Sequence, residues 1–446
     1  PGSKLTTIGD KAFQGVVISS IHLPPHVHTI EKYAFSYNSN LEEVTLSEEL
    51  KTIKAHAFRG CGLTSIVIPP STENIDVSTF NGNPLQTIII RSVNMYTGDN
   101  AFNWNDYHIH ILFDVADELK TTSYTFYARG GCSVYIPWDY KGDESLLNIM
   151  KIQPPKYRTG IDGYFERLDT CTVLYTFNNE GVVDTVSALK DIGCRGDISI
   201  RSSVRGHELR RVKANGFGQG NNKSNTFQTV FTDIETITLP SSIEYIEEGG
   251  FAGCKALRSV RLPTGLKSIG EGAFQDCRSL KSVIIPSTVE YIANSSFSTL
   301  DKLDVYYEGE HEPKWGNVFS ASSRIHVPMS YQDEIVDRIG NALTSGFFER
   351  TESGECTVVY RYCGDDELCL SSVRSYGCSG HIEARELVRN RVVTSVEESG
   401  FESSQLETIS LPSTVRKIGR NAFKKCQELL EVDIPSGVRE IGASAY

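Results

Sequence analysis

The chain has 446 residues, of which 39% are hydrophobic and 22% charged, and its formal net charge is −12 at pH 7. The length allows several domains, and the apolar residues spread along it argue against a disordered chain. The acidic balance argues against a duplex nucleic acid partner, and no run of about 18 apolar residues is present to span a membrane.

An aromatic residue returns along the chain, mostly at steps of 22 or 23 residues. These anchors are Phe13, Phe35, Phe58, Phe80, Phe102, Phe126, Phe217, Phe251, Phe274, Phe297, Phe319, Phe401, Phe423 and Tyr446. Self-similarity at such a period predicts a solenoid, in which each coil packs against its neighbours.

Each copy of the repeat contains a short alternating run that predicts a β-strand. In the clearest copy, Val260 and Leu262 alternate with polar residues and are expected to point inward. Pro263 ends the strand, because proline has no N–H to donate to a ladder. The chain then returns through a segment ending near Ile269 and brings Phe274 into the core. Stacked coils with parallel strands about 4.8 Å apart would bury a continuous core.

The anchors lapse over about residues 138–195 and 329–380, and the two gaps match each other at a shift of 183 to 185 residues. Phe165-Glu166-Arg167, for example, recurs as Phe348-Glu349-Arg350. The first half of each gap continues from a strand that ends in Pro137 or Pro328 into a helical pattern. In the second copy one helical face comprises Tyr331, Ile335, Val336, Ile339 and Leu343, and Ser330 and Asp333 are spaced as a capping box.

The second half of each gap predicts a β-hairpin, with a strand at residues 172–177 and a turn at residues 178–181 in the first copy. We therefore expect three capped arrays. Residues 1–155 end in a helical cap, residues 156–341 have a hairpin cap and a helical cap, and residues 342–446 begin with a hairpin cap. Both chain ends cut through a coil, so we expect a fragment of a longer protein. The predicted fold is an α/β-type leucine-rich repeat solenoid of about 14 coils, with short parallel strands and few helices.

The pattern Ile269-Gly270, Ala273-Phe274 and Cys277, after a strand that ends in Pro263, resembles the BspA-like family of leucine-rich repeats. The resemblance covers most of the chain, and ordinary leucine-rich repeats lack the Ala-Phe pair. It implies a secreted or surface-anchored microbial protein that takes part in adhesion and host contact.

The eleven cysteines fall into groups. Four lie three residues after an anchor, an inward position that predicts buried free thiols: Cys61, Cys254, Cys277 and Cys426. Cys171 and Cys194 recur as Cys356 and Cys378 in the matching gaps, which predicts a disulfide in each hairpin cap.

Cys363 and Cys369 flank a tight turn in the third array and are further disulfide candidates. A zinc site made of the four cysteines of that cap is the alternative, although the C-x2-C spacing of common zinc sites is missing. Cys132 has no evident mate.

No phosphate-binding loop, zinc-protease motif, nucleophile elbow or dinucleotide fingerprint is present, so we predict no catalytic residue, no metal and no cofactor. Two groups of histidines lack a third ligand at useful spacing and are expected on the surface or in a groove. They are His108 with His110, and His22 with His26 and His28.

The residue between the two inward strand positions is expected to face outward. In the first array this column contains Val67, Ile89, Leu112 and Tyr135, about 4.8 Å apart, and predicts an exposed apolar stripe that binds a partner. The alternatives are that a loop covers the stripe, or that β-branched residues simply suit strands.

Two functional hypotheses follow. The first is a non-enzymatic protein-binding or adhesion module that presents its solenoid surface to extracellular-matrix or cell-surface macromolecules. The second is a passive spacer within a larger cell-surface protein. An enzyme has no candidate residue in this sequence.

Overall fold

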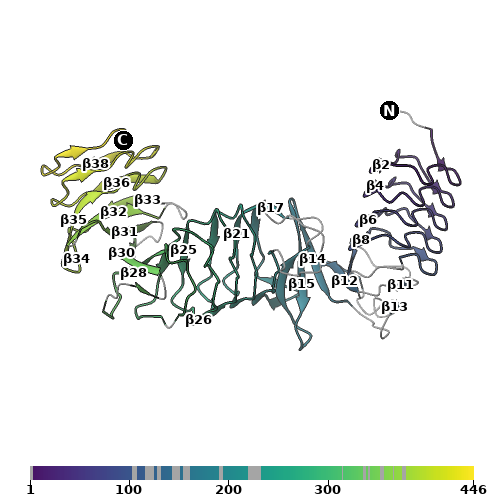
Figure 1. Cartoon of the computed structure of the whole chain (residues 1–446), viewed down its shortest axis with the longest axis horizontal. Helices are drawn as coiled ribbons and strands as arrows, with labels where there is room; N and C mark the ends of the chain where they lie inside the picture. Colours follow the sequence, from purple (N-terminus) through teal and green to yellow (C-terminus); the bar gives the residue numbers. More distant parts are fainter. Residues whose placement is uncertain are drawn as a thin grey trace. The chain divides into compact units, whose positions relative to one another are not determined.

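Short parallel strands, stacked coil upon coil, make up the chain in the computed structural model (Figure 1). The structure describes residues 4–102, 108–115, 125–127, 132–142, 151–153, 161–189, 194–218, 233–313, 315–334, 338–339, 342–351, 356–364, 366–373 and 378–446. The chain divides into two compact units, Pro1–Gly193 with Ser203–His207, and Cys194–Ser202 with Glu208–Tyr446.

Each coil of the first unit contributes a front strand and a two-residue back strand. The back strands form one parallel sheet of β1 (Thr7–Ile8), β3 (Thr29–Ile30), β5 (Thr52–Ile53), β7 (Asn74–Ile75) and β9 (Tyr96–Thr97). The front strands are β2 (Ser20–His22), β4 (Glu43–Thr45), β6 (Ser65–Ile68), β8 (Thr87–Ile90), β10 (Ile109–Phe113) and β12 (Cys132–Pro137). A small parallel pair, β11 (Thr125–Tyr127) and β13 (Lys151–Gln153), accompanies them.

The aromatic anchors form stacks along the core of the coils. Neighbouring rings lie with centroids 4.9 to 5.5 Å apart from Phe13 to Phe102, from Phe217 to Phe319 and from Phe401 to Tyr446. One ring per coil, at nearly the spacing of adjacent strands, places each ring against the next. The predicted anchor role is confirmed.

A left-handed residue lies two positions before most of the anchors. These residues have φ between 53° and 63° and include Lys11, Tyr33, His56, Ser78, Asn100, Asn215, Gly249, Gly272, Ser295, Ser399, Asn421 and Ser444. The conformation turns the chain sharply enough to direct the anchor into the core. It costs a residue with a Cβ roughly 1–2 kcal/mol, which glycine avoids.

The front ladder of the first unit continues past β12 into antiparallel strands. β14 (Gly163–Leu168) pairs in parallel with β12, and β15 (Cys171–Phe177) and β16 (Val183–Ala188) follow in antiparallel order. Gly181, at φ 78°, lies in the turn between β15 and β16. The hairpin predicted at residues 172–181 is therefore present.

The second unit begins with the same two kinds of strand. Its front strands are β17 (Arg195–Ser199), β21 (Asp233–Thr238), β23 (Ser259–Arg261), β25 (Ser282–Ile285), β27 (Asp304–Tyr307) and β28 (Arg324–Pro328). Its back strands are β20 (Arg211–Val212), β22 (Tyr245–Ile246), β24 (Ser268–Ile269) and β26 (Tyr291–Ile292). After β28 the ladder passes through β30 (Ala342–Arg350), β31 (Thr357–Tyr362) and β32 (Glu367–Ser372).

This ladder then passes from the front strands of the coils to the back strands. β32 pairs in parallel with β35 (Arg391–Val396), which leads to β37 (Lys417–Ile418) and β39 (Glu440–Ile441), the back strands of the last coils. The front strands of these coils form a separate sheet of β33 (Ser379–Glu383), β36 (Gln405–Ser410) and β38 (Glu431–Asp433). A front ladder thus becomes a back ladder, and a new front sheet starts at β33.

The helical cap predicted after Pro328 is wrong in its described part. The described residues contain no helix, and the segment expected to be helical holds turns, β29 (Arg338–Ile339) and the start of β30. Asp333 accepts a hydrogen bond from the backbone N–H of Glu312 (2.6 Å) instead of capping a helix, and Leu343 is 45% exposed. β30 adds to β28 as a strand and pairs with the backbone N–H and C=O groups at the open edge of the ladder. A helix at this place would leave those groups without hydrogen bonds.

In its described part the solenoid is therefore all β rather than α/β, with about 16 turns rather than about 14. The count from aromatic anchors misses turns that lack such a residue. The helix expected after Pro137 and the array boundary at residue 155 fall largely outside the described residues.

The cysteines divide as their positions suggested. Disulfides join Cys356 to Cys378 and Cys363 to Cys369, and Cys171 and Cys194 are also disulfide-bonded. The free cysteines are Cys61, Cys132, Cys254, Cys277 and Cys426, of which the first four are buried. Burial raises the pKa of the Cys61 thiol to about 11 and that of the Cys254 thiol to about 12, so these thiols stay protonated.

Candidate binding site

The column proposed as an exposed stripe is buried. Parallel pairing does align Val67, Ile89, Leu112 and Tyr135 in one row. However, Ile89, Leu112 and Tyr135 are only 5%, 0% and 3% exposed, and Val67 packs against them. The expectation of an exposed contact surface on these four residues is wrong.

The cap accounts for this burial. Phe165 of β14, Leu174 of β15 and Leu189 belong to the same hydrophobic cluster as Leu112 and Tyr135. The second unit repeats the arrangement, with Ile284 and Tyr306 packed into a cluster with cap residues Phe348, Val359 and Val373. In each unit, then, apolar front strands lie where cap side chains cover their outer face.

The recurrent Phe-Glu-Arg motif has a structural cause. In both caps its glutamate accepts a hydrogen bond from a tyrosine hydroxyl, Tyr175 to Glu166 at 2.5 Å and Tyr360 to Glu349 at 2.7 Å. The arginine that follows forms an ion pair in each unit, Arg167 with Asp114 and Arg350 with Glu308. The motif therefore fastens the cap strands to each other and to the preceding coil.

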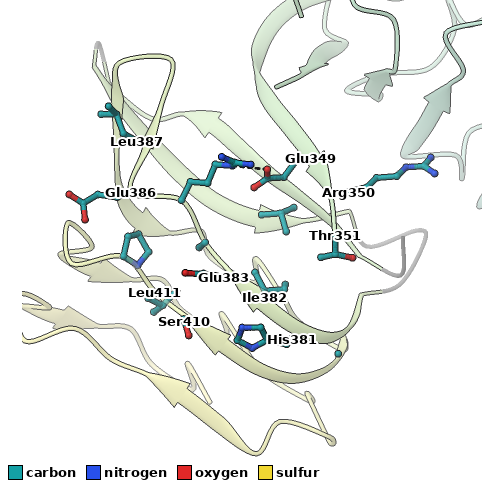
Figure 2. Close-up of a pocket in the computed structure, with 15 residues that line it drawn as sticks. Glu349, Arg350, Thr351, His381, Ile382, Glu383, Glu386, Leu387, Ser410 and Leu411 are labelled. Carbon is teal, nitrogen blue, oxygen red and sulfur yellow. Dashed lines mark hydrogen bonds and ion pairs between the residues drawn. The ribbon is translucent and has the colours of Figure 1, made fainter. Parts of the chain in front are cut away.

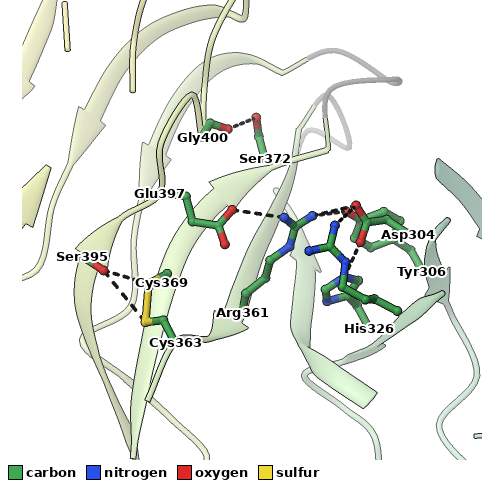
Figure 3. A network of polar contacts seen from close by, with 11 residues as sticks. Asp304, Tyr306, His326, Arg361, Cys363, Cys369, Ser372, Ser395, Glu397 and Gly400 are labelled. Atoms are coloured by element: carbon green, nitrogen blue, oxygen red, sulfur yellow. Dashed lines mark hydrogen bonds and ion pairs between the residues drawn. A yellow bond between two sulfur atoms is a disulfide. The ribbon is translucent and has the colours of Figure 1, made fainter. Parts of the chain in front are cut away.

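A half-buried polar network around the buried ring of His326 links the cap of the second unit to the coils on both sides (Figure 3). Asp304 of β27 accepts hydrogen bonds from Arg324 (2.8 Å), from Arg361 (3.1 Å) and from the ring of His326 (3.3 Å). Arg361 also pairs with Glu397 at 3.2 Å. Residues from four separate stretches of the chain thus share one set of ionic hydrogen bonds.

Burial sets the protonation of this network. Burial alone would raise the pKa of Asp304, but the hydrogen bond from His326 and the charges of Arg361 and Arg324 hold it below its usual range. For His326 the order is reversed, because burial outweighs the bond to Asp304 and lowers the pKa of the ring. His326 is therefore neutral at pH 7, and its role is structural.

No group of three side chains suited to a metal ion occurs among the described residues. The exposed rings of His26 and His28 both contact the carboxylate of Glu49, at 3.2 and 3.1 Å, and His22 bonds to Thr45 at 2.9 Å. The predicted surface position of these three histidines is correct. His110, in contrast, is half-buried against Tyr135, with ring centroids 5.8 Å apart.

A groove of about 1050 Å³ lies where the new front sheet begins, beside the cap of the third array (Figure 2). Its lining residues are Glu349, Arg350, Thr351, Val358, residues 380–387 and residues 410–412. One wall thus comes from β30 and β31, and the other comes from β33 and the segment that follows it. Sequence reasoning missed this groove, because the recurring motif that contains Glu349 and Arg350 gives no sign that β33 lies beside it.

Hydrogen bonds hold the first wall of the groove in place. Glu349 accepts from the hydroxyl of Tyr360 and from Nε of Arg385 (2.7 Å each), and the Tyr360 hydroxyl accepts from the backbone N–H of Arg385 (3.2 Å). Burial raises the pKa of Tyr360, so its hydroxyl remains a donor to Glu349. Both arginines of the groove are neutralised, Arg385 by Glu349 and Arg350 by Glu308.

Two carboxylates of the groove have no ion pair among the described residues. They belong to Glu383 and Glu386, and the latter accepts a hydrogen bond from the Ser413 hydroxyl at 2.9 Å. Leu387, beside them, is 54% exposed. The groove is therefore acidic, with an apolar margin.

Stacked parallel coils of this kind define a leucine-rich-repeat-type solenoid. More narrowly, the family profile of the BspA type leucine-rich repeat region matches residues 3–128, 222–314 and 370–446 in 6 copies, and the chain belongs to this family. Both hairpin caps fall mainly in the gaps between the matched segments. Leucine-rich repeat folds of this kind are typically non-enzymatic.

Solved structures with a similar fold include the pneumococcal vaccine antigen PcpA, at 16% identity and TM-score 0.32, covering 78% of this chain and 80% of that one. A leucine-rich cell surface protein of Faecalibacterium prausnitzii has 17% identity and TM-score 0.28, covering 78% of this chain and 84% of its own. A leucine-rich repeat protein of Bacteroides ovatus has 18% identity and TM-score 0.21, covering 99% and 79%. No curated protein matches the chain.

No helix among the described residues is long and apolar enough to cross a membrane.

Proposed function

We propose that this chain is a non-enzymatic protein-binding module of a secreted or cell-surface microbial protein, and that it binds extracellular-matrix or cell-surface macromolecules. One observation carries the proposal, the acidic groove of the third array, where two unpaired carboxylates line an open cavity beside a sheet edge. Concave sites with a few convergent polar groups are where proteins bind ligands most often.

The test is binding of the whole chain to purified extracellular-matrix proteins and to intact cultured cells, measured by biolayer interferometry and flow cytometry. We expect saturable binding that weakens when Glu383 and Glu386 are both replaced by lysine. The matched control reverses two exposed carboxylates of the first unit, Glu42 and Glu43, and should bind as the wild type does.

The passive spacer is favoured for the first unit by one observation, the burial of its apolar column. Saturable binding would exclude a purely passive role for the chain. If matrix proteins and cells both fail to bind, the proposed function is wrong.

A further inference from the structure

β33 is the first strand of a sheet, and its outer edge is open. Among the described residues this sheet runs in the order β33-β36-β38, with β33 at the end. The strands that precede β33 in the chain do not continue into it, because their ladder passes from β32 to the back strand β35. The change from front ladder to back ladder therefore leaves β33 without the neighbour that a preceding coil would supply.

The backbone of β33 presents hydrogen-bonding groups to this open edge. The N–H of Ala384 donates to the carbonyl of Ser410 at 3.1 Å, so Ala384 faces β36. N–H and C=O groups alternate in direction along a strand, so those of Glu383 and His381 point away from β36. The register irregularity of this pair lies before His381 and does not alter that alternation. Both residues supply a donor and an acceptor on the side away from the sheet.

The groove gives an added strand a place to lie. Its lining includes Gly380 to Leu387 on the side of β33, and Glu349 to Thr351 on the other (Figure 2). The cavity of about 1050 Å³ is just above the range of about 300–1,000 Å³ found for small-molecule pockets. It therefore suits a segment of extended peptide better than a single metabolite.

The charges of the groove select the kind of peptide. Glu383 and Glu386 have no ion pair among the described residues, whereas Arg385 and Arg350 are already paired. A strand that enters beside β33 places alternate side chains on one face, so basic residues two apart lie on the same side as each other. Exposed Leu387 offers contact to the aliphatic part of a lysine or arginine.

We infer that the groove binds an extended basic peptide segment, which adds as a strand to the open edge of β33 and places lysine or arginine side chains against Glu383 and Glu386. The inference rests on the proposed function and names its partner as the basic, extended segment of a protein. Main-chain hydrogen bonds to His381 and Glu383 supply the affinity, and the carboxylates supply the selectivity.

The experiment uses the full chain and capped eight-residue peptides in which lysine alternates with threonine, measured by fluorescence anisotropy. We expect saturable binding that weakens with salt, and no binding of the analogue in which glutamate replaces lysine. Two further peptides carry N-methyl groups on alternate backbone amides, one peptide for each register, so that each lacks the N–H donors of one edge. In one of the two N-methyl registers, binding should fall at least tenfold.

The protein variant replaces Glu383 and Glu386 by glutamine, which keeps the size of both side chains and should leave the melting temperature unchanged. We expect at least a tenfold loss of peptide affinity, while Glu42→Gln with Glu43→Gln binds normally. Equal binding of both N-methyl registers and the parent peptide would overturn strand addition. Binding that ignores the two glutamates would overturn the assignment of the site.

The two proposals fail in different ways. If matrix proteins or cells bind the chain but the basic peptides do not, the further inference is wrong and the proposed function stands. If the peptides bind but no matrix protein or cell does, the groove takes basic peptides and the proposed class of partner is wrong.

Discussion

Leu112 and Tyr135 lie side by side in register on the parallel strands β10 and β12, and their exposed fractions are only 0% and 3%. Leu112→Asp therefore places a carboxylate without a partner in a closed apolar cluster. We expect it to destabilise the first unit by at least about 3–5 kcal/mol, the usual cost of an uncompensated buried charge. Urea unfolding followed by far-ultraviolet circular dichroism measures this loss.

Val17→Asp is the matched control, because Val17 is 85% exposed. It should change the free energy of unfolding by less than about 0.5 kcal/mol. A Leu112→Asp protein as stable as this control would show that the apolar column is open to solvent after all.

The stacked anchors lead to a second prediction. Phe274 is fully buried, between Phe251 at 5.2 Å and Phe297 at 4.9 Å. Phe274→Ala should lower the free energy of unfolding by about 3–5 kcal/mol. Phe13→Ala should cost less in its own unit, since Phe13 is 36% exposed. Equal losses at both positions, measured by urea unfolding, would contradict a core made by the stack.

The anchors were predictable because the constraint that sets them is local. Each coil must bury one ring against the next, so the aromatic period in the sequence is the period of the structure. The burial of Leu112 was not predictable in this way, because Phe165 and Leu174, which share its cluster, come from a cap more than fifty residues later. A strand pattern gives the alternation of side chains but not what covers each face.

The groove was hidden from the sequence for a related reason. It exists because β32 pairs with β35 and not with β33, and this choice between two later strands leaves no periodic signal. The helical cap predicted after Pro328 is absent because strand pairing competes with helix formation for the same residues. Apolar residues at helical spacing also fit the two strands β29 and β30, and the open edge of β28 favours strands.

The left-handed turn before most of the anchors gives a third prediction. Gly272 has φ 59°, and a Cβ added there meets only the flexible Gln275 side chain within 3.4 Å, so backbone strain dominates. Gly272→Val should destabilise the second unit by roughly 1–2 kcal/mol. Gly272→Asn should cost clearly less, because asparagine adopts this conformation at Asn215 and Asn421. Equal melting temperatures for the two variants would refute the conformational explanation.

Cysteine chemistry gives a fourth prediction. Alkylation of the denatured, unreduced protein should label the five free cysteines out of eleven, and mass mapping should find Cys356 and Cys378 unlabelled. In the folded protein, buried Cys61 and Cys254 should react slowly, since burial raises their pKa values to about 11 and about 12. Labelling of all eleven, with or without a chelator, would rule out the disulfides.

The buried ring of His326 gives a prediction about pH. Burial lowers its pKa in the folded state, despite the bond to Asp304, whereas in the unfolded chain the pKa is about 6.5. As the pH falls below about 6.5, His326 binds a proton in the unfolded state but stays neutral in the folded state. The second unit therefore loses stability. The loss is at most about 1.4 kcal/mol per pH unit from this group. Asp304, whose folded pKa is below its usual range, adds a further loss only below about pH 4.

Urea midpoints at pH 7.5, 6.5, 5.5 and 5.0 test this prediction on the wild type and on His326→Gln, which keeps a donor for Asp304 but cannot titrate. The variant starts less stable, because glutamine loses the stacking of the ring on Tyr306 at 4.9 Å. Its midpoint should nevertheless fall less between pH 6.5 and 5.0 than that of the wild type. His381→Gln, at an exposed position in the same unit, should keep the wild-type profile. If His326→Gln and the wild type lose stability in parallel over this range, His326 is not the group that responds to acid.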